Sequence, residues 1–273
     1  MTAQAIARTE IERANSSFWD ELCGTRFARS LGITDSSAES LARYDHWYFS
    51  FYPYLERYVP FAELAGKRVL EVGLGYGSVC QRLAECGAIY AGLDIAAGPV
   101  EMARRRLAMC GCQGDVRQGS VLAAPFADAS FDLVVAIGCY HHTSDIRQAL
   151  RETHRLLAPG GQALIMVYNA FSYRRWLRAP LSTLRHLMRA KTARDPSVAV
   201  SARQRAWYDT NTAGEPPPVT QFVSRADLRH LARDFAEFAC TTENAAIPLG
   251  PRAWWLATLG RIAGLDLYAS LRR

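Results

Sequence analysis

The stretch that decides the fold is Val69-Leu70-Glu71-Val72-Gly73-Leu74-Gly75-Tyr76-Gly77-Ser78. The apolar run over residues 68–72 predicts a buried strand, and apolar residues at helical spacing then continue up to Gly87. Between them stand three glycines at alternate positions, which accept positive φ and place no Cβ between the turn and a ligand. A strand, a glycine turn and the free N–H groups of a helix start predict a cradle for a nucleotide.

Two features of the turn bear on which nucleotide it holds. Gly73 and Gly75 meet the dinucleotide fingerprint G-x-G-x-x-G/A, but the third place of that fingerprint falls on Ser78. Glu71 lies inside the strand, where a carboxylate would repel a pyrophosphate but suits a ligand that carries an ammonium and a sulfonium. No Gly-Lys-Ser/Thr follows, which excludes a Walker loop. These residues alone do not exclude the alternative that this is an ordinary strand–helix turn that binds no ligand.

Strands and helices continue to alternate after the turn. The sequence predicts a second strand that ends in Asp94, a helix from Pro99 to Met109, and further strands near residues 115–118, 131–138 and 162–168. A helix that begins near residue 145 is expected to stop at Pro159-Gly160-Gly161. Because the strands are apolar throughout, they predict a parallel sheet that is covered by helices on both faces.

Three motifs in this order resemble those of the class I S-adenosylmethionine (SAM) dependent methyltransferases that act on small molecules. They are Glu-x-Gly-x-Gly-x-Gly at residues 71–77, FDLVVAIGCYHHTSD at 131–145 and ETHRLLAPGGQAL at 152–164. The resemblance spans residues 67–168. It implies an α/β fold with a Rossmann-like seven-stranded sheet, completed by a terminal antiparallel strand. It also implies SAM as the cofactor and S-adenosylhomocysteine as its product.

The resemblance assigns nine residues to the cofactor: Glu71, Gly73, Gly75, Gly77, Asp94, Ile95, Ser120, Val121 and Gly138. The three turn glycines would touch the methionyl part, and Glu71 would hold its ammonium through the backbone or water. Asp94 is expected to accept both ribose hydroxyls. Ile95 would pack on the adenine, with Ser120 and Val121 beside it, and Gly138 would approach the sulfur. Ser120 departs from the family, which more often has an Asp there.

The sequence says less about the residues that bind and activate the methyl acceptor. His141 and His142 follow the fourth strand, and a histidine that titrates near neutral pH is a natural base for a hydroxyl. His141 is slightly preferred, and the alternative that one of the pair packs or caps the next helix stays open. Metal-dependent methylation needs an acidic ligand where Gly138 and Cys139 stand, so no metal is predicted. The predicted substrate-binding residues are Tyr44, Tyr48, Tyr52, Tyr140, Tyr168 and Asn169.

The chain is divided into four parts. Residues 1–62 form an N-terminal helical and aromatic cap, 63–168 the SAM-binding core, 169–223 a basic helical insertion, and 224–273 the part that completes the core sheet. The insertion is expected to act as a substrate cap. Nine aromatic residues fall between Tyr44 and Phe61. They either pack the core of the cap or form a wall of the substrate site.

The positive charge belongs to one segment. Residues 174–205 hold nine Lys or Arg and one acid, Asp195, which gives +8, while the rest of the chain sums to −2. An amphipathic basic helix is predicted from the spacing of Trp176, Leu177, Leu181, Leu184 and Met188. The segment is a solvated face, a site for an acidic small molecule or acidic carrier protein, or a site for nucleic acid or an anionic membrane. Nucleic acid is disfavoured because the basic stretch is single.

Composition also bears on where the protein is located and on the class of function it has. Seven cysteines without a CxxC pair, and a polar N-terminus without a signal peptide, predict reduced thiols in the cytoplasm. No run of about 18 apolar residues exists, so no transmembrane helix is expected. The sequence predicts a SAM-dependent methyltransferase of a small molecule, with O-methylation in specialised metabolism preferred. The alternatives are N- or C-methylation of a small or carrier-bound substrate, an NAD(P)-binding oxidoreductase, and a non-catalytic methyltransferase-like protein. The oligomeric state is not predicted.

Overall fold

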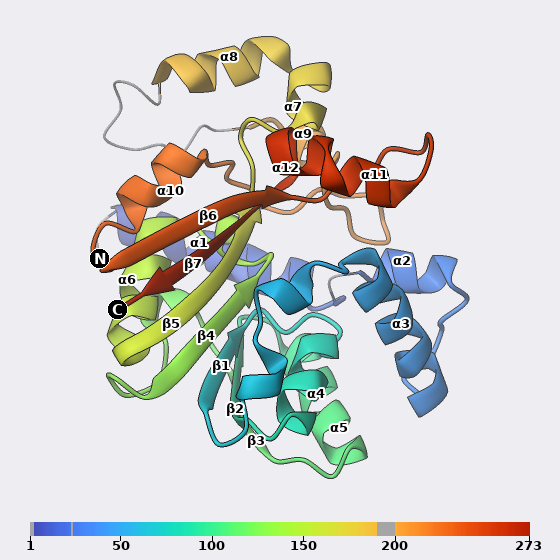
Figure 1. Cartoon of the computed structure of the whole chain (residues 1–273), viewed down its shortest axis with the longest axis vertical. Coiled ribbons are helices and arrows are strands. Elements are labelled where there is room, and N and C mark those ends of the chain that lie inside the picture. The colour runs from blue at the N-terminus through green and yellow to red at the C-terminus, as the bar shows by residue number, and fades with distance from the viewer. Residues whose placement is uncertain (1–2, 23, 190–199) are drawn as a thin grey trace.

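The computed structural model describes residues 3–22, 24–189 and 200–273. Within them, one sheet of seven strands has the order β3-β2-β1-β4-β5-β7-β6 (Figure 1). The strands are β1 Arg68–Val72, β2 Ile89–Asp94, β3 Gly114–Gln118, β4 Phe131–Ile137, β5 Leu157–Tyr168, β6 Glu237–Glu243 and β7 Asp266–Arg272. All neighbouring pairs are parallel except those of β7, which runs antiparallel to both β5 and β6. The predicted Rossmann-like sheet and its antiparallel terminal strand are confirmed.

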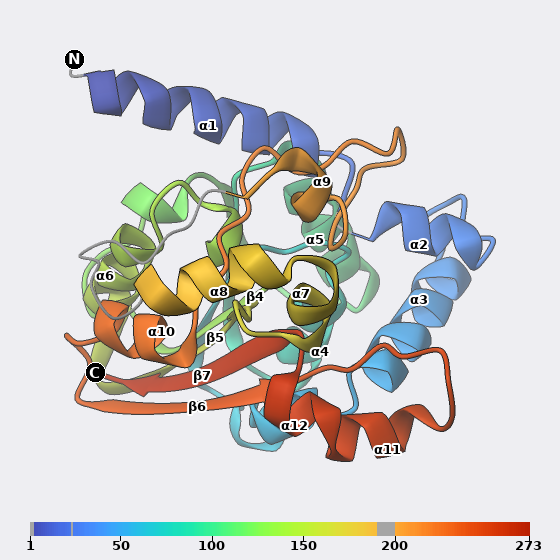
Figure 2. The same cartoon turned by 90° about the horizontal axis from the view of Figure 1, so that it is seen from above.

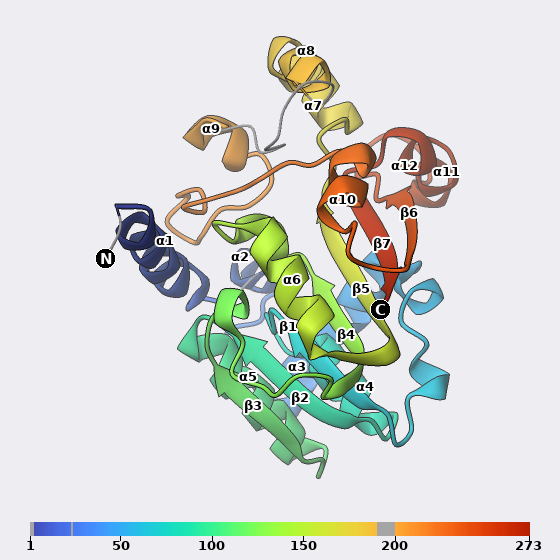
Figure 3. The same cartoon turned by 90° about the vertical axis from the view of Figure 1, so that its left-hand side faces the viewer.

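Helices cover both faces of the sheet (Figure 3). They are α4 Ser78–Glu85, α5 Ala97–Met109, α6 Ile146–Leu156 and α10 Arg225–Leu231. Successive side chains of β1 point to opposite faces, so Val69 joins the core beside α4 and α5, while Leu70 joins the core beside α6 and α10. Because both cores are apolar, the central strands have no polar face, as the sequence predicted.

Some predicted boundaries are wrong. α5 begins at Ala97 rather than at Pro99. α6 ends at Leu156, and β5 already starts at Leu157, so Pro159-Gly160-Gly161 lie within the strand rather than stopping the helix. The pairing of β4 with β5 is irregular between Phe131 and Leu133, which accommodates these residues in the strand. Residues 252–263 form two further helices, α11 Arg252–Ala257 and α12 Leu259–Ala263.

The N-terminal cap is helical, as predicted, with α1 Ala3–Trp19, α2 Thr25–Ser30 and α3 Ala38–Phe51. Short 3₁₀ turns at Leu55–Arg57 and Phe61–Glu63 lead into β1. Figure 2 shows α1 as a long outer helix on the side of the molecule away from β6 and α12. Side-chain bonds attach it to the core: for example, Arg8 donates to the Leu122 carbonyl at 3.0 Å, and Ser16 donates to the Ile95 carbonyl at 3.0 Å.

The insertion lies between β5 and β6 and contains α7 Tyr173–Arg178, α8 Pro180–Arg189 and α9 Ala202–Arg205. The predicted basic helix is therefore broken, and Pro180 begins its second part because proline fits the first helical position. Lys191, Arg194 and Asp195, which the charge count included, lie outside the described residues. Of the helices described, none has the length and apolar content needed to cross a bilayer. The division into four parts stays a prediction.

Candidate functional site

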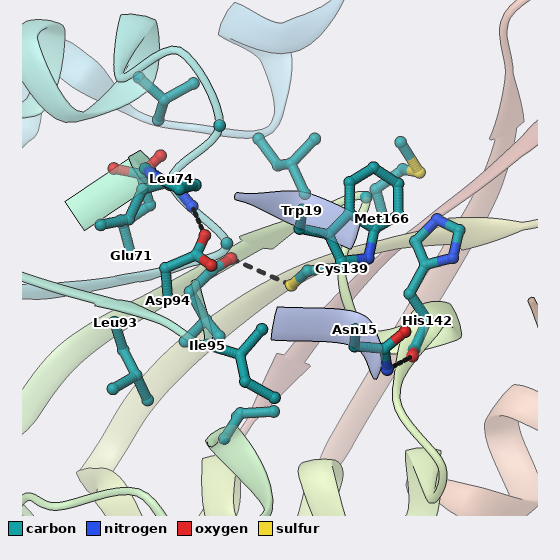
Figure 4. Close-up of a pocket in the computed structure, with 18 of the residues that line it drawn as sticks. Asn15, Trp19, Glu71, Leu74, Leu93, Asp94, Ile95, Cys139, His142 and Met166 are labelled. Atoms are coloured by element: carbon teal, nitrogen blue, oxygen red, sulfur yellow. Dashed lines mark hydrogen bonds between the residues drawn. The ribbon is translucent and has the colours of Figure 1, made fainter. Parts of the chain in front are cut away.

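A cavity of about 320 Å³ opens at the carboxyl ends of β1, β2 and β4, where the glycine turn lies (Figure 4). Gly73 and Gly75 line it with φ of 83° and 49°. A Cβ at Gly73 would lie 2.6 Å from the Cβ of Cys139, two residues beyond the end of β4. Only glycine fits there, so the turn lets β1 and β4 approach each other beside the cavity.

Gly77 has another role than the one predicted. It does not line the cavity, and a Cβ there would lie 2.7 Å from the Cδ of Arg106. Arg106 is fully buried and binds both carboxylate oxygens of Asp45 in α3, at 2.7 and 2.9 Å. The missing side chain at Gly77 makes room for this arginine, which attaches the N-terminal cap to α5.

Asp94 stands at the end of β2 and faces the turn. Its Oδ2 accepts the Leu74 N–H at 2.8 Å, and its Oδ1 accepts the Ala96 N–H at 2.9 Å. Burial raises the pKa of Asp94 to about 6, although these backbone bonds act in the opposite direction. Each carboxylate oxygen has two lone pairs, so each keeps one for a ribose hydroxyl. The predicted ribose contact therefore fits the observed bonds.

Glu71 is buried in β1 at the floor of the cavity. Its Oε2 accepts the Tyr90 hydroxyl at 2.7 Å. Burial raises the pKa of Glu71 to about 8, and the neighbouring Asp94 adds to the rise. A cationic ligand in the cavity would therefore favour the ionised form of Glu71, as expected for the site of an ammonium.

The predicted adenine wall includes a partner that the sequence did not reveal. Ile95, Ser120 and Val121 all line the cavity. The Ser120 hydroxyl donates to Oε1 of Glu12 in α1 at 2.6 Å. Glu12 thus brings a carboxylate to the region where the family more often has an Asp in place of Ser120. This pairing of Ser120 with Glu12 could not be predicted from the sequence, because the two residues are 108 positions apart.

Helix α1 supplies two more lining residues, Asn15 and Trp19 (Figure 4). Asn15 Nδ2 donates to the backbone carbonyl of His142 at 2.7 Å, and the Trp19 ring lies 4.7 Å from the His142 ring. Neither was predicted, since nothing local in the sequence places α1 across the end of β4. These contacts make α1 one wall of the cavity.

The two histidines differ in position. His142 lines the cavity, whereas His141 is fully buried, with its ring centroid 3.9 Å from that of Tyr168. Burial, together with the neighbouring His142, lowers the pKa of His141 well below its usual range. The preference for His141 as the base is therefore reversed, because a fully buried imidazole cannot reach an acceptor in the cavity.

His142 is held in one tautomer. Its Nδ1 lies 2.8 Å from the Val219 carbonyl oxygen, which can only accept, so Nδ1 carries the proton. Its Nε2 lies 3.5 Å from Oδ2 of Asp209, which also accepts the Tyr168 hydroxyl at 2.7 Å. Asp209 and Val219 both come from the insertion, and Asp209 was not predicted. The arrangement leaves a basic nitrogen beside a carboxylate that can stabilise its protonated form.

The aromatic wall was predicted in part. Tyr44, Tyr48, Tyr52 and Tyr168 line the cavity. It is further lined by Trp47, one of the nine clustered aromatics, and by Trp19 and Tyr76, which were not predicted to bind substrate.

Two predicted substrate residues are wrong. Tyr140 is buried in the core, where its hydroxyl bonds to the Thr153 hydroxyl at 2.6 Å. Asn169 is also buried, and its side-chain amide is occupied: it donates to the Gly264 carbonyl and accepts the Phe171 N–H.

The charge of the lining separates two classes of cofactor. Four carboxylates line the cavity, those of Glu12, Glu71, Asp94 and Asp209, and among the described residues that line it there is no Lys or Arg. Such a site repels a pyrophosphate and suits a sulfonium and an ammonium. It also disfavours the acidic acceptor that the basic insertion had suggested.

Comparison with known proteins agrees with this geometry. Residues 70–165 match the family model described as a methyltransferase domain. Residues 70–165 therefore carry a methyltransferase domain of the kind that the sequence motifs indicated. SAM is the cofactor that this family implies. The glycine turn at residues 73–77 lies near the start of the matched region.

Curated relatives match over less than half of the chain. A ubiquinone biosynthesis O-methyltransferase of Pseudomonas aeruginosa is 34% identical over 111 residues, which is 40% of this chain and 47% of that protein. A demethylmenaquinone methyltransferase of Thermus thermophilus is 33% identical over 108 residues, or 39% and 49% of the two chains. The chain thus spans about half the length of the curated relatives it matches.

Solved structures share the fold over a longer span. The YcgJ protein of Bacillus subtilis superposes with a TM-score of 0.55 at 18% identity, over 81% of this chain and 98% of that one. A SAM-dependent methyltransferase from Mesorhizobium loti gives 0.54 at 20% identity, over 81% and 97%. These likenesses concern the fold.

In the part of the chain that the structure describes, no group of three His, Cys, Asp or Glu side chains is placed to share a metal ion. That the reaction uses no metal stays a prediction.

Proposed function

We propose that this methyltransferase domain transfers the methyl group of SAM to a hydroxyl of a small, uncharged aromatic molecule, with His142 as the base. The observation that carries the proposal is the fixed tautomer of His142, whose Nδ1–H faces the Val219 carbonyl at 2.8 Å. Its basic Nε2 then stands at the wall of the same cavity as the glycine turn.

When bound, SAM supplies an electrophilic methyl group on a sulfonium. His142 Nε2 takes the proton as the O–H bond of the acceptor breaks and the new O–CH₃ bond forms. S-adenosylhomocysteine, a neutral thioether, would be the other product once the S–CH₃ bond has broken. The Asp209 carboxylate, 3.5 Å from Nε2, stabilises the imidazolium that this transfer creates.

The aromatic wall would position the acceptor. Trp19, Tyr44 and Tyr48 offer rigid apolar area in the lining of the cavity. Holding the acceptor oxygen in line with the S–CH₃ bond at about 3 Å contributes much of the rate. A neutral ring suits these walls, since the lining carboxylates disfavour an acid.

The relatives support oxygen as the accepting atom, because the Pseudomonas protein is named an O-methyltransferase of ubiquinone biosynthesis. A role in specialised metabolism stays a prediction, as do the cytoplasmic location and the carrier-bound substrate.

The test is mass spectrometry of phenols, catechols and aromatic amines incubated with the protein and SAM labelled in the methyl group. We expect a labelled methyl on a hydroxyl of at least one phenol or catechol, formed together with S-adenosylhomocysteine. A labelled methyl on nitrogen or carbon would replace the O-methylation proposal. SAM binding without any product from any acceptor would favour the non-catalytic alternative.

A further inference from the structure

Helices α7 and α8 turn polar side chains towards the protein and apolar side chains towards solvent. Thr183 and His186 of α8 face the protein and are 0% and 1% exposed. The outer side carries six large apolar residues that are each more than a third exposed, namely Trp176, Leu177, Leu181, Leu184, Leu187 and Met188. A helix on a protein in water normally turns its apolar stripe inward. This outward stripe is therefore unpartnered within the described chain.

Specific polar contacts hold the helices in this orientation. His186 Nε2 lies 3.0 Å from Oδ2 of Asp227, which belongs to the capping box of α10. Arg175 is buried, donates to the Ala170 carbonyl at 3.0 Å and lies over the Phe222 ring. Turning the leucines inward would break these bonds, so the outward apolar face is built into the packing.

The same face is basic. Arg178, Arg185 and Arg189 are exposed among the apolar residues, and residues 173–189 contain no Asp or Glu. Figures 1 and 3 show α8 at the outer end of the molecule, with no other element beyond it. Three more exposed apolar residues, Leu249, Trp254 and Ile262, belong to the segment of α11 and α12. That segment is tied to α7 by a bond from the Ala246 N–H to the Tyr173 hydroxyl at 3.1 Å.

We propose that the outer face of α7 and α8 docks on an anionic lipid surface and lies in its interface without crossing it. Large aliphatic side chains enter the boundary between head groups and acyl chains, while the interleaved arginines meet lipid phosphates. A second copy of this chain fits the face poorly, since its arginines would meet each other. An acidic protein would pair with the arginines but would need a groove for a convex row of leucines.

The docking face and the proposed site belong to one insertion. Arg174 of α7 donates to the Trp207 carbonyl at 3.0 Å, and Ser172 bonds to the Tyr208 hydroxyl at 2.9 Å. Asp209, which follows directly, lines the cavity. Binding at the face would therefore act on the same insertion that supplies Asp209 to the cavity.

Vesicle co-sedimentation of the full chain tests the docking face without reference to activity. Vesicles of phosphatidylcholine alone are compared with vesicles that also contain phosphatidylglycerol. We expect strong partitioning onto the anionic vesicles only, weakened by added salt. Replacing the three arginines (R178Q, R185Q and R189Q together) should lower partitioning on the order of a hundredfold. Replacing three apolar residues (L181S, L184S and M188S together) should lower it at least about tenfold.

Matched controls are Met109→Ser and Arg151→Gln, which change exposed residues of the same types on α5 and α6. They should bind as the unmodified chain does, and all variants should keep their melting temperature because the altered residues are exposed. Equal binding to neutral and anionic vesicles, or no binding, would overturn the proposal. So would light scattering that shows a dimer, lost in the leucine variant, in a chain that ignores both kinds of vesicle.

Discussion

At the scale of the single residue, the site rests on carboxyl groups that burial holds partly protonated. Asp94 and Glu71 could be predicted from the sequence because both lie within or next to the strands that carry the motifs. Glu12, Asn15 and Asp209 could not, since each reaches the cavity through contacts with residues far away in the chain. The histidine pair was found, but only burial separates His142 from His141.

The ribose contact of Asp94 makes SAM affinity depend on pH. Its pKa is raised to about 6 in the free protein, and ribose hydroxyls donate to the ionised form. Affinity should therefore fall as pH falls through 6, by about tenfold at pH 5 relative to pH 7. Titration calorimetry measures it. Asp94→Asn should bind about 1–3 kcal/mol more weakly at pH 7 and lose the part of this pH dependence that is centred on pH 6, whereas the part due to Glu71 should remain. Unchanged affinity in the variant would remove Asp94 from the ribose site.

The base assignment predicts a split between turnover and binding. His142→Gln should lower kcat by about 10²–10⁴-fold, because the proton no longer has an acceptor, while SAM affinity stays within about twofold. His141→Gln is the control, and its turnover per SAM-binding molecule should stay close to that of the unmodified protein. Steady-state kinetics with active molecules counted by SAM binding measures both. The reverse order of the two effects would return the base role to His141.

At the scale of the element, the sequence was sufficient wherever a strand or helix is decided by its own apolar pattern. The central strands and α4 to α6 follow from buried runs and helical spacing. The start of β5 was misplaced because Pro159-Gly160-Gly161 indicates a stop, whereas the irregular pairing with β4 accommodates these residues in the strand. In the sequence, only Pro180 indicates the break between α7 and α8. The outward apolar face could not be predicted, because it depends on which side of the helices finds polar partners.

The glycine turn should tolerate alanine less well than a glycine with the same backbone and open surroundings. Gly73 and Gly111 both have positive φ, at 83° and 67°. A Cβ at Gly73 would lie 2.6 Å from the Cβ of Cys139, whereas nothing lies within 4 Å of one at Gly111. Both alanine variants lose about 1–3 kcal/mol to backbone strain, and Gly73→Ala should lose more through the clash. Chemical denaturation measures the free energy of unfolding of each variant. Equal losses would mean that the added Cβ at Gly73 is accommodated without a clash.

At the scale of the whole molecule, three buried carboxyl groups set a pH dependence of stability. Burial raises the pKa of Glu71 to about 8, of Asp266 to about 7 and of Asp94 to about 6. Unfolded, these groups titrate near pH 4, so the folded chain binds more protons than the unfolded chain between these values. Their contribution to stability is full below about pH 4 and is lost as pH rises through the folded pKa of each group.

Glu71→Gln tests this dependence. The amide still accepts the Tyr90 hydroxyl but cannot ionise, so the variant should melt above the unmodified protein at pH 8 in the absence of SAM. The difference should shrink towards pH 5, where Glu71 is neutral in the folded chain. Glu101→Gln, on the exposed side of α5, should show neither effect. Scanning calorimetry at the two pH values measures it, and a difference that does not change with pH would contradict the raised pKa of Glu71.

A crystal structure of the protein grown with S-adenosylhomocysteine would show whether the glycine turn holds the cofactor. We expect the ligand to lie in the cavity at the ends of β1, β2 and β4, with its methionyl part along Gly73 and Gly75. Its ribose hydroxyls should lie within hydrogen-bond distance of the Asp94 carboxylate, and its sulfur should point towards the side of the cavity that His142 lines. A ligand bound elsewhere, with Asp94 bonded to the Leu74 and Ala96 N–H groups alone, would contradict this expectation.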